Sequence, residues 1–283
     1  MRAYGRERFV KRLNRALGLS VLILTTALLM LPLAALFVAS LKLDSEYLRW
    51  PIVLFPKVPQ WIHYEQVLGL ARFAKAVVRT TLLGIPYAIV ITLTSALAGY
   101  GFARYLVPAN SRLFGIVVAM LIVPEMVILI PTFIIYAQLK LHNTYWPWVL
   151  SALAGSPFYI FLFRQFFLNF PRELEEAAEV DGCGPLRIFV QIFLPNSTAV
   201  LATVMFFAFN GIWSSYLVPL IYLKDTQTLL GVVMASEFQN PRGIKLTTLS
   251  MAGTVIYILP PVLAFFLAQK HILRGVVTTG LKG

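Results

Sequence analysis

The sequence predicts an all-α integral membrane protein with six transmembrane helices, and three observations support this prediction. Hydrophobic residues make up 59% of the 283-residue chain, only 13% are charged, and the mean hydropathy is +0.78. A soluble domain averages roughly 25% charged residues, so a soluble fold could not cover this much apolar surface. Long runs with few or no charges also recur along the chain. They are continuously apolar, without the alternation of membrane strands, which favours helices.

Six apolar runs are the predicted spans. The first, residues 18–40, carries no charge and would form roughly 34 Å of helix, enough to cross a hydrocarbon core of about 30 Å. No small-x-small cleavage site follows a short apolar stretch, so we expect an uncleaved span rather than a signal peptide. The remaining runs are residues 80–103, 113–136 (interrupted only by Glu125), 147–163, 196–223 and 249–268.

The basic residues predict a cytoplasmic N-terminus. The N-terminal tail, residues 1–17, carries six Lys or Arg residues, and these residues accumulate on the cytoplasmic side of membrane proteins. With six spans in the domain 18–268, the segments 104–112 and 164–195 and the tail 269–283 are then cytoplasmic too. The inside segments hold 14 of the 24 basic residues, which is a small excess.

The first extracytoplasmic loop, residues 41–79, is rich in proline and aromatic residues. Near its end, Arg72, Lys75 and Arg79 stand at helical spacing. This pattern suggests a short amphipathic helix on the membrane surface. An irregular loop is the alternative.

The net charge of +12 admits either nucleic acid or membrane as a partner. Many of the charges lie between the apolar runs rather than in one patch, so we interpret them as orientation and headgroup contacts, and expect no nucleic acid. The single cysteine, Cys183, excludes an intrachain disulfide, and we expect it to be a small filler residue in a turn.

The longest internal polar stretch, residues 164–195, predicts two short helices joined at a sharp angle. Pro171 can begin the first helix, with Glu173, Glu175 and Glu176 in its first turns, where carboxylates complement the helix dipole. Gly182 and Gly184 can end it. The helical spacing i, i+3, i+4, i+7 gives one stripe in each helix. The first stripe is Leu174, Ala177, Ala178 and Asp181, and the second is Leu186, Phe189, Val190 and Phe193. Small side chains and clustered acids favour docking to a basic partner over lying on an anionic membrane.

The same stretch resembles the EAA signature of ABC importer permeases. Glu176, Ala177 and Ala178 are followed at the family spacing by Gly182 and then by Ile192-Phe193-Leu194-Pro195. The resemblance implies a type I ABC importer permease fold and a cytoplasmic coupling helix seated in an ATPase subunit. The residues that it assigns to ATPase coupling are Glu176, Ala177, Ala178, Asp181, Gly182, Ile192, Leu194 and Pro195.

Other stretches resemble the maltose-type carbohydrate branch of that family. They include Tyr100 to Arg104, Asn143-Thr144-Tyr145, Pro219-Leu220 and the last span and tail. The resemblance implies a sugar or oligosaccharide substrate in a bacterial inner membrane. It also implies a second permease subunit (a heterodimer), two cytoplasmic ATPase subunits that hold ATP and Mg²⁺, and an extracytoplasmic binding protein. The tail 269–283 would either contact the ATPase pair or be a disordered basic tail. Two departures, Arg79-Thr80-Thr81 where the family usually has Asn-Ser and Ser214 where it has Asn, leave the substrate open.

Two features of the spans are candidates for the substrate pathway. Glu125 is the only acid inside a predicted span, and such a carboxylate suggests a functional role, although it directly follows Pro124 and could lie near the interface. A neutral sugar needs hydrogen bonds and aromatic faces. Asn210, Trp213 and Tyr216 are three residues apart and predict a shared helix face, with Ser214 beside them. Interhelical hydrogen bonding is the alternative.

Motifs that the chain lacks narrow its function. No G-x-x-x-x-G-K-[ST] phosphate loop occurs, no nucleophile elbow, and the three histidines are far apart in sequence, so we expect no bound cofactor, no metal and no catalysis. A permease for another solute, such as glycerol 3-phosphate, is the first alternative. It would favour basic residues in the pathway. An intramembrane enzyme would need clustered catalytic residues, and a passive channel would not need a docking loop.

Overall fold

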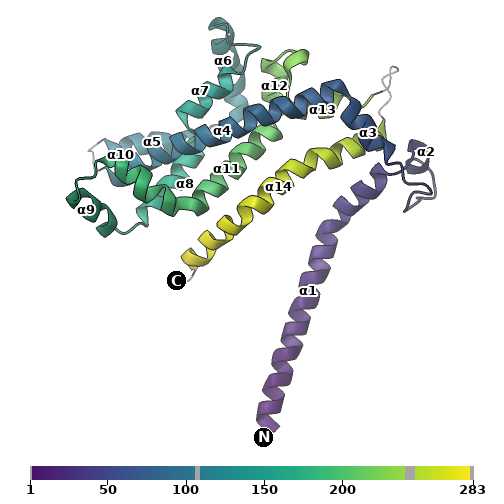
Figure 1. Ribbon diagram of the computed structural model, residues 1–283, viewed down its shortest axis with the longest axis horizontal. Helices are drawn as coiled ribbons and strands as arrows, with labels where there is room; N and C mark the ends of the chain where they lie inside the picture. Colours follow the sequence, from purple (N-terminus) through teal and green to yellow (C-terminus); the bar gives the residue numbers. More distant parts are fainter. Residues whose placement is uncertain (1, 106–108, 240–245, 281–283) are drawn as a thin grey trace. The chain divides into compact units, whose positions relative to one another are not determined.

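The computed structural model describes the backbone of residues 2–105, 109–239 and 246–280, and within these segments the side chains between residues 13 and 271. Its regular structure is helical (Figure 1). The α-helices are α1 (Arg2–Ser40), α2 (Asp44–Tyr47), α3 (Ile62–Gly69), α4 (Ala71–Arg104), α5 (Asn110–Met120), α6 (Glu125–Gln138), α7 (Trp146–Ala154), α8 (Pro157–Leu168), α9 (Glu173–Val180), α10 (Pro185–Ile188), α11 (Thr198–Trp213), α12 (Leu217–Tyr222), α13 (Leu230–Ser236) and α14 (Thr247–Gly280). A π-helix, Phe189–Phe193, and two 3₁₀ turns, Pro195–Ser197 and Asp225–Gln227, complete the set.

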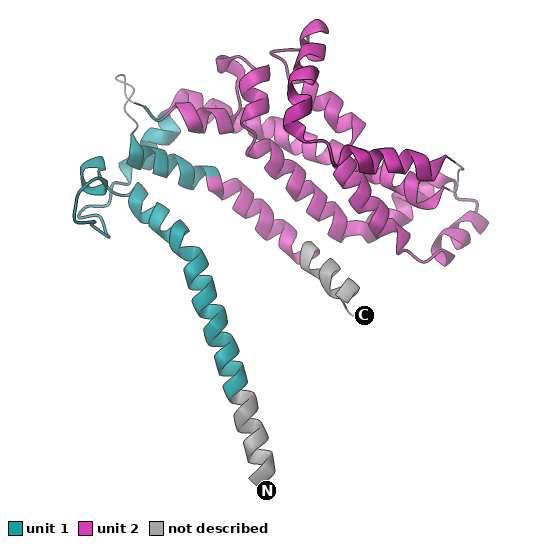
Figure 2. Cartoon of the chain, turned by 180° about the vertical axis from the view of Figure 1, so that it is seen from behind, with its two compact units in different colours: residues 1–69, 238–257 teal, residues 70–237, 258–283 magenta. Residues whose placement is uncertain are grey.

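The chain divides into two compact units (Figure 2). One unit holds residues 1–69 together with 238–257, and the other holds residues 70–237 together with 258–283. The second unit contains the acidic loop and the candidate pathway residues predicted from the sequence.

Five helical stretches are long and apolar enough to cross a membrane, which confirms five of the six predicted runs. They are Leu13–Ser40, Ala71–Arg104, Trp146–Leu168, Pro195–Trp213 and Thr247–His271. The fourth predicted run is interrupted at Gly155, whose φ of +75° favours glycine. Beside it, the backbone N–H of Ser156 donates to Ser95 Oγ of α4 at 3.1 Å, so this N–H at the interruption has an acceptor inside the protein. The fifth run is shorter than predicted, because its helix ends at Trp213 and residues 217–222 form the separate helix α12.

The third predicted run is not one straight helix. It consists of α5 and α6, bent by 99° across a break of a few residues. Pro124 stands at this break with an extended ψ of 134°, and proline lacks the backbone N–H that would continue the helical ladder. Pro86 and Pro131, by contrast, lie inside α4 and α6 without breaking them. The two parts of the bent pair together make the sixth candidate span.

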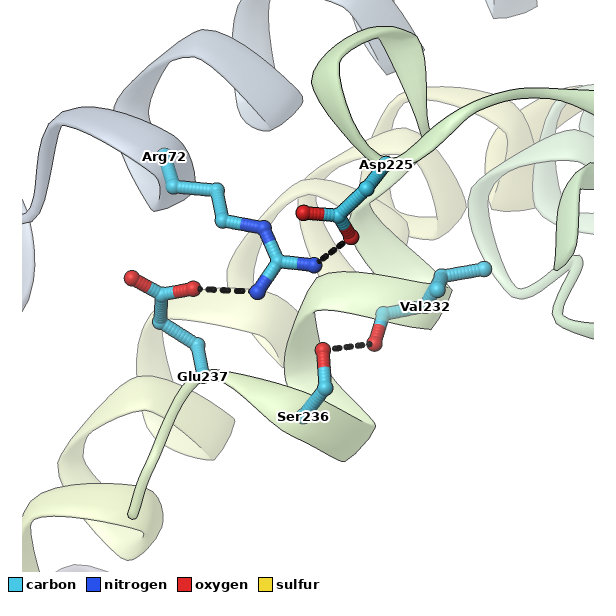
Figure 3. A network of polar contacts seen from close by, with 5 residues as sticks. All are labelled: Arg72, Asp225, Val232, Ser236 and Glu237. Atoms are coloured by element: carbon cyan, nitrogen blue, oxygen red, sulfur yellow. Dashed lines mark hydrogen bonds and ion pairs between the residues drawn. The ribbon is translucent and has the colours of Figure 1, made fainter. Parts of the chain in front are cut away.

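The prediction of a short surface helix over residues 70–79 is wrong. These residues begin α4, a continuous helix of 34 residues, and Phe73 and Ala76 are fully buried. Arg72 pairs with two acids (Figure 3): its Nη2 with Asp225, and its Nη1 with Glu237 Oε2 at 2.8 Å. The basic face of this segment therefore includes a residue held by acids of the protein itself.

Helix α4 is the centre of the second unit. It packs against α7, α8, α11 and α13, and the hydroxyl of its buried Thr80 accepts a hydrogen bond from the backbone N–H of Leu230 at 2.9 Å. It approaches α8 closely at Gly99, where a Cβ atom would lie 2.6 Å from Phe163 Cβ and 3.1 Å from the Ile160 carbonyl oxygen. Small residues allow this kind of close contact between membrane helices.

Gly99→Ala should therefore destabilise the protein, because the added methyl group must push α4 and α8 apart. We expect a loss of about 1–3 kcal/mol, measured as a lower melting temperature of the purified protein in detergent. Gly101→Ala is the matched control, since a Cβ at Gly101 meets no atom within 4 Å. Equal melting temperatures for the two variants would contradict the close packing at Gly99.

Candidate functional site

The predicted acidic loop, residues 164–195, begins later than expected, because residues 164–168 continue α8, and its remainder forms two short helices as predicted. Helix α9 begins at Glu173, two residues after Pro171, and carries Glu173, Glu175 and Glu176 in its first turn. Gly182 ends it with a φ of +76°. The N–H of Gly182 donates to Glu179 O at 3.0 Å and that of Cys183 to Ala178 O at 2.9 Å, the two bonds of a Schellman motif. Glycine is favoured at position 182 because side chains rarely adopt this left-handed backbone conformation.

The second helix differs from the predicted pattern. Ile188, Phe189 and Phe193 are buried, whereas Leu186 and Val190 are 65% and 50% exposed. The later part of this helix is the π-helix Phe189–Phe193, in which Leu194 N–H bonds to Phe189 O across five residues. This wider turn shifts the side chains away from the α-helical spacing that predicted the stripe.

The end of α4 supports this loop. Arg104 is nearly buried; it donates from Nη2 to Phe170 O at 2.8 Å, its Nε lies 3.6 Å from Glu175 Oε2, and its guanidinium lies 5.0 Å from the centre of the Phe193 ring. The ring of Tyr100, one turn earlier, lies 4.7 Å from that of Phe193 and 5.2 Å from that of Phe189. Aromatic contacts and an ion pair thus fix the position of the loop on α4.

The predicted coupling residues divide into an outer and an inner group. Glu176, Ala177, Asp181, Gly182 and Pro195 are exposed, as is Val180 at 88%. Ala178, Ile192 and Leu194 face inward and pack on the cluster around Tyr100 and Phe193. We call the exposed group with Glu173, Glu179 and Leu174 the loop knob. It presents exposed carboxylates and small apolar side chains, which is the surface that a basic cleft would fit.

A polar cavity of about 340 Å³ lies elsewhere in the second unit. Its wall comes from α4, α6, α7, α8, α11 and α12, and Thr132 and Tyr222 share a hydrogen bond of 2.8 Å within it. Glu125, exposed at the first position of α6, belongs to its lining. The other hydrogen-bonding side chains of the lining are Tyr87, Tyr136, Trp148, Ser151, Tyr159 and Ser215. Among the described residues, the lining contains hydroxyls, one indole and one carboxylate, and no Lys or Arg.

The predicted pathway cluster is not brought together. Trp213 is buried and stacks on Phe209 at 5.6 Å between ring centres, and Asn210 O accepts a hydrogen bond from the Ser214 hydroxyl at 2.8 Å. Tyr216 lies after the end of α11, so it does not share the helix face of Asn210 and Trp213. It lines a second hollow of about 410 Å³ with Glu125. Of the predicted pathway residues, Glu125 and Tyr216 line a common hollow.

The sequence signal for the cavity was the set of hydroxyl residues inside apolar spans. Tyr87, Ser151 and Tyr159 each lie within a predicted apolar run, but their separation along the chain hides their common location. Among the side chains that the structure describes, no group of three or more His, Cys, Asp or Glu could hold a metal ion.

Comparison with known proteins gives a consistent result. The model of a family described as "Binding-protein-dependent transport system inner membrane component" matches residues 93–278. The lactose transport system permease protein LacG of Rhizobium radiobacter is 38% identical over 65% of this chain and 67% of its own length. The sn-glycerol-3-phosphate transport system permease protein UgpE of Yersinia pestis bv. Antiqua is 30% identical over 91% of this chain and 94% of its own.

The fold has a counterpart among solved structures. A chain of a bacterial ABC transporter involved in the import of the acidic polysaccharide alginate superposes with a TM-score of 0.76, covering 92% of this chain and 96% of that chain at 19% identity. The likeness supports the predicted permease fold.

Removing the charge of Glu175 should loosen the loop from α4. Glu175→Gln leaves the nearly buried Arg104 without its carboxylate, and we expect a local cost of about 1–3 kcal/mol. Hydrogen exchange of the amides in residues 173–188 should accelerate accordingly. Glu179→Gln, an exposed carboxylate on the same helix, should change stability by less than about 0.5 kcal/mol. Similar exchange rates in both variants would show that the pair of Arg104 and Glu175 does not hold the loop on α4.

Proposed function

This chain belongs to the family of inner membrane components of binding-protein-dependent transport systems, and we propose that it is the permease subunit of an importer for a sugar or oligosaccharide. Membership makes it a multi-pass membrane component of a transport system rather than an enzyme, as the sequence predicted. The observation that carries the proposal is the loop knob held rigidly on the end of α4.

The loop knob is the surface that an ATPase subunit binds and moves when it hydrolyses ATP. Its carboxylates complement a basic cleft, and Ala177 and Val180 allow close apolar contact at its centre. Because Arg104 and the Tyr100 cluster fix the loop on α4, movement of an ATPase subunit would be passed to a helix of 34 residues. The same helix carries Tyr87 into the polar cavity, so docking and pathway share one rigid element.

The complete importer then contains further chains. We expect a second permease subunit, different in sequence, two cytoplasmic ATPase subunits that bind ATP and Mg²⁺, and an extracytoplasmic solute-binding protein. This chain itself binds no cofactor. With the knob in the cytoplasm, six spans place both termini there. Any contact of the tail 269–283 with the ATPase pair involves residues whose side chains are mostly outside the described part of the structure.

The polar cavity supports a neutral, hydroxyl-rich solute. Tyrosine, serine and threonine hydroxyls with an indole ring provide the hydrogen bonds and the apolar face that a sugar ring uses. The lactose permease LacG is a relative with a sugar in its name. The relative UgpE is named for glycerol 3-phosphate, but a phosphate would favour a cation in the lining, and the cavity has Glu125 instead. We therefore favour the sugar.

Filling the centre of the loop knob should separate the chain from its ATPase. Ala177→Trp adds a large ring on an exposed position, so we expect normal folding and at least a tenfold loss of association, about 1.4 kcal/mol or more. Co-purification with the ATPase subunit and transport-coupled ATP hydrolysis measure the loss. Ser111→Trp is the control, because Ser111 is an exposed small residue of α5 on the same predicted side of the membrane. Undiminished association of Ala177→Trp would overturn the docking role.

Removing one cavity hydroxyl should weaken solute uptake without affecting assembly. Tyr159→Phe removes one hydrogen bond worth about 0.5–1.5 kcal/mol, so we expect a roughly two- to tenfold higher KM for sugar uptake into proteoliposomes with the binding protein. Tyr47→Phe, outside the cavity, is the control. In the same assay, sn-glycerol 3-phosphate should not compete with the sugar. Uptake of the phosphate in place of neutral sugars would sink the proposed substrate class.

A further inference from the structure

An apolar patch projects from the segment between α2 and α3. Six large apolar side chains within eleven residues are 65% to 83% exposed: Leu48, Trp50, Ile52, Leu54, Phe55 and Val58. We call them the loop patch. A surface of this kind is unfavourable in water and marks a contact with a protein or a membrane.

The loop patch is held at the end of a membrane span. Its segment folds back onto the last turn of α1, where Gln60 N–H donates to Leu41 O at 2.9 Å and the ring of Trp61 lies 6.2 Å from that of Phe37. Lys42 is buried beneath it and donates from Nζ to Val53 O at 2.5 Å. The patch is therefore attached at the C-terminal end of Leu13–Ser40, a helix long and apolar enough to cross a membrane.

The charges around the loop patch favour an anionic partner. Its two neighbouring acids are engaged within the protein: Asp44 Oδ1 accepts from Thr248 N–H at 2.8 Å, and Glu46 accepts from the N–H groups of Leu43 and Lys57, each at 3.4 Å. The cationic side chains of Arg49 and Lys57 flank the patch, and among the described residues neither has an acid within salt-bridge distance.

We propose that the loop patch inserts into the lipid headgroup region at the C-terminal end of α1, with Arg49 and Lys57 on phosphate groups. Tryptophan and other aromatic side chains prefer this interfacial zone, and cations near it are attracted to anionic lipids. Continuity with the span places the patch there without any further element. The segment thereby sets the depth of α1 in the membrane.

Spin labels at single cysteines can test this depth. In a Cys183→Ala background, Phe55→Cys places the label in the loop patch, Ile23→Cys in the middle of α1, and Thr226→Cys on an exposed polar turn. The assembled transporter is reconstituted into vesicles of phosphatidylethanolamine and phosphatidylglycerol. Accessibility to oxygen, which concentrates in lipid, and to a water-soluble nickel chelate is measured for each label.

We expect the label at position 55 to have an oxygen-to-nickel ratio several-fold above that at position 226 and below that at position 23. A ratio equal to that at position 226 would show that the patch faces water. Protection from both reagents would show that a protein covers it. Either result overturns the proposal. Replacing Arg49 and Lys57 by Gln should move the label outward in these anionic vesicles, and an unchanged depth would exclude the phosphate contacts.

Discussion

Arg104 stands at the end of α4 with almost no access to solvent, and a buried cation needs partners within the protein. It finds the carbonyl of Phe170, the carboxylate of Glu175 and the ring of Phe193, three groups that belong to the start, first helix and end of the acidic loop. The helix that leads into the loop, α8, lies close to α4 at Gly99, which brings these groups near Arg104. Position and orientation of the loop therefore follow from one cation and one glycine on the same helix.

Helix α4 connects every functional element of the second unit. At its beginning, Arg72 binds the acids Asp225 and Glu237, and Thr80 holds α13. Tyr87 then enters the polar cavity, and Tyr100 and Arg104 support the loop at its end. A rigid helix of this length would pass a displacement at one end to the other end, which would join the proposed docking surface to the proposed solute path.

Local patterns predicted the helices well and the long-range contacts poorly. Apolar runs located the spans because their length and lack of charge are local properties, and Gly182 ended α9 as its backbone preference predicted. The break at Pro124 could not be separated from the tolerated prolines at 86 and 131, since the surrounding packing decides. The acid partners of Arg72 lie more than 150 residues away. The π-helix, which decides the buried face of the loop, has no sequence period of its own.

The break before Glu125 has a consequence for water in the resting protein. The first amides of a helix lack intrahelical acceptors, and at α6 they stand beside a carboxylate within a bent span. Hydrocarbon could not satisfy these groups, so within a bilayer they need water or polar side chains such as those of the cavity that Glu125 lines. A sugar bound there, as proposed above, would exchange its hydrogen bonds to water for hydrogen bonds to hydroxyl side chains of the lining.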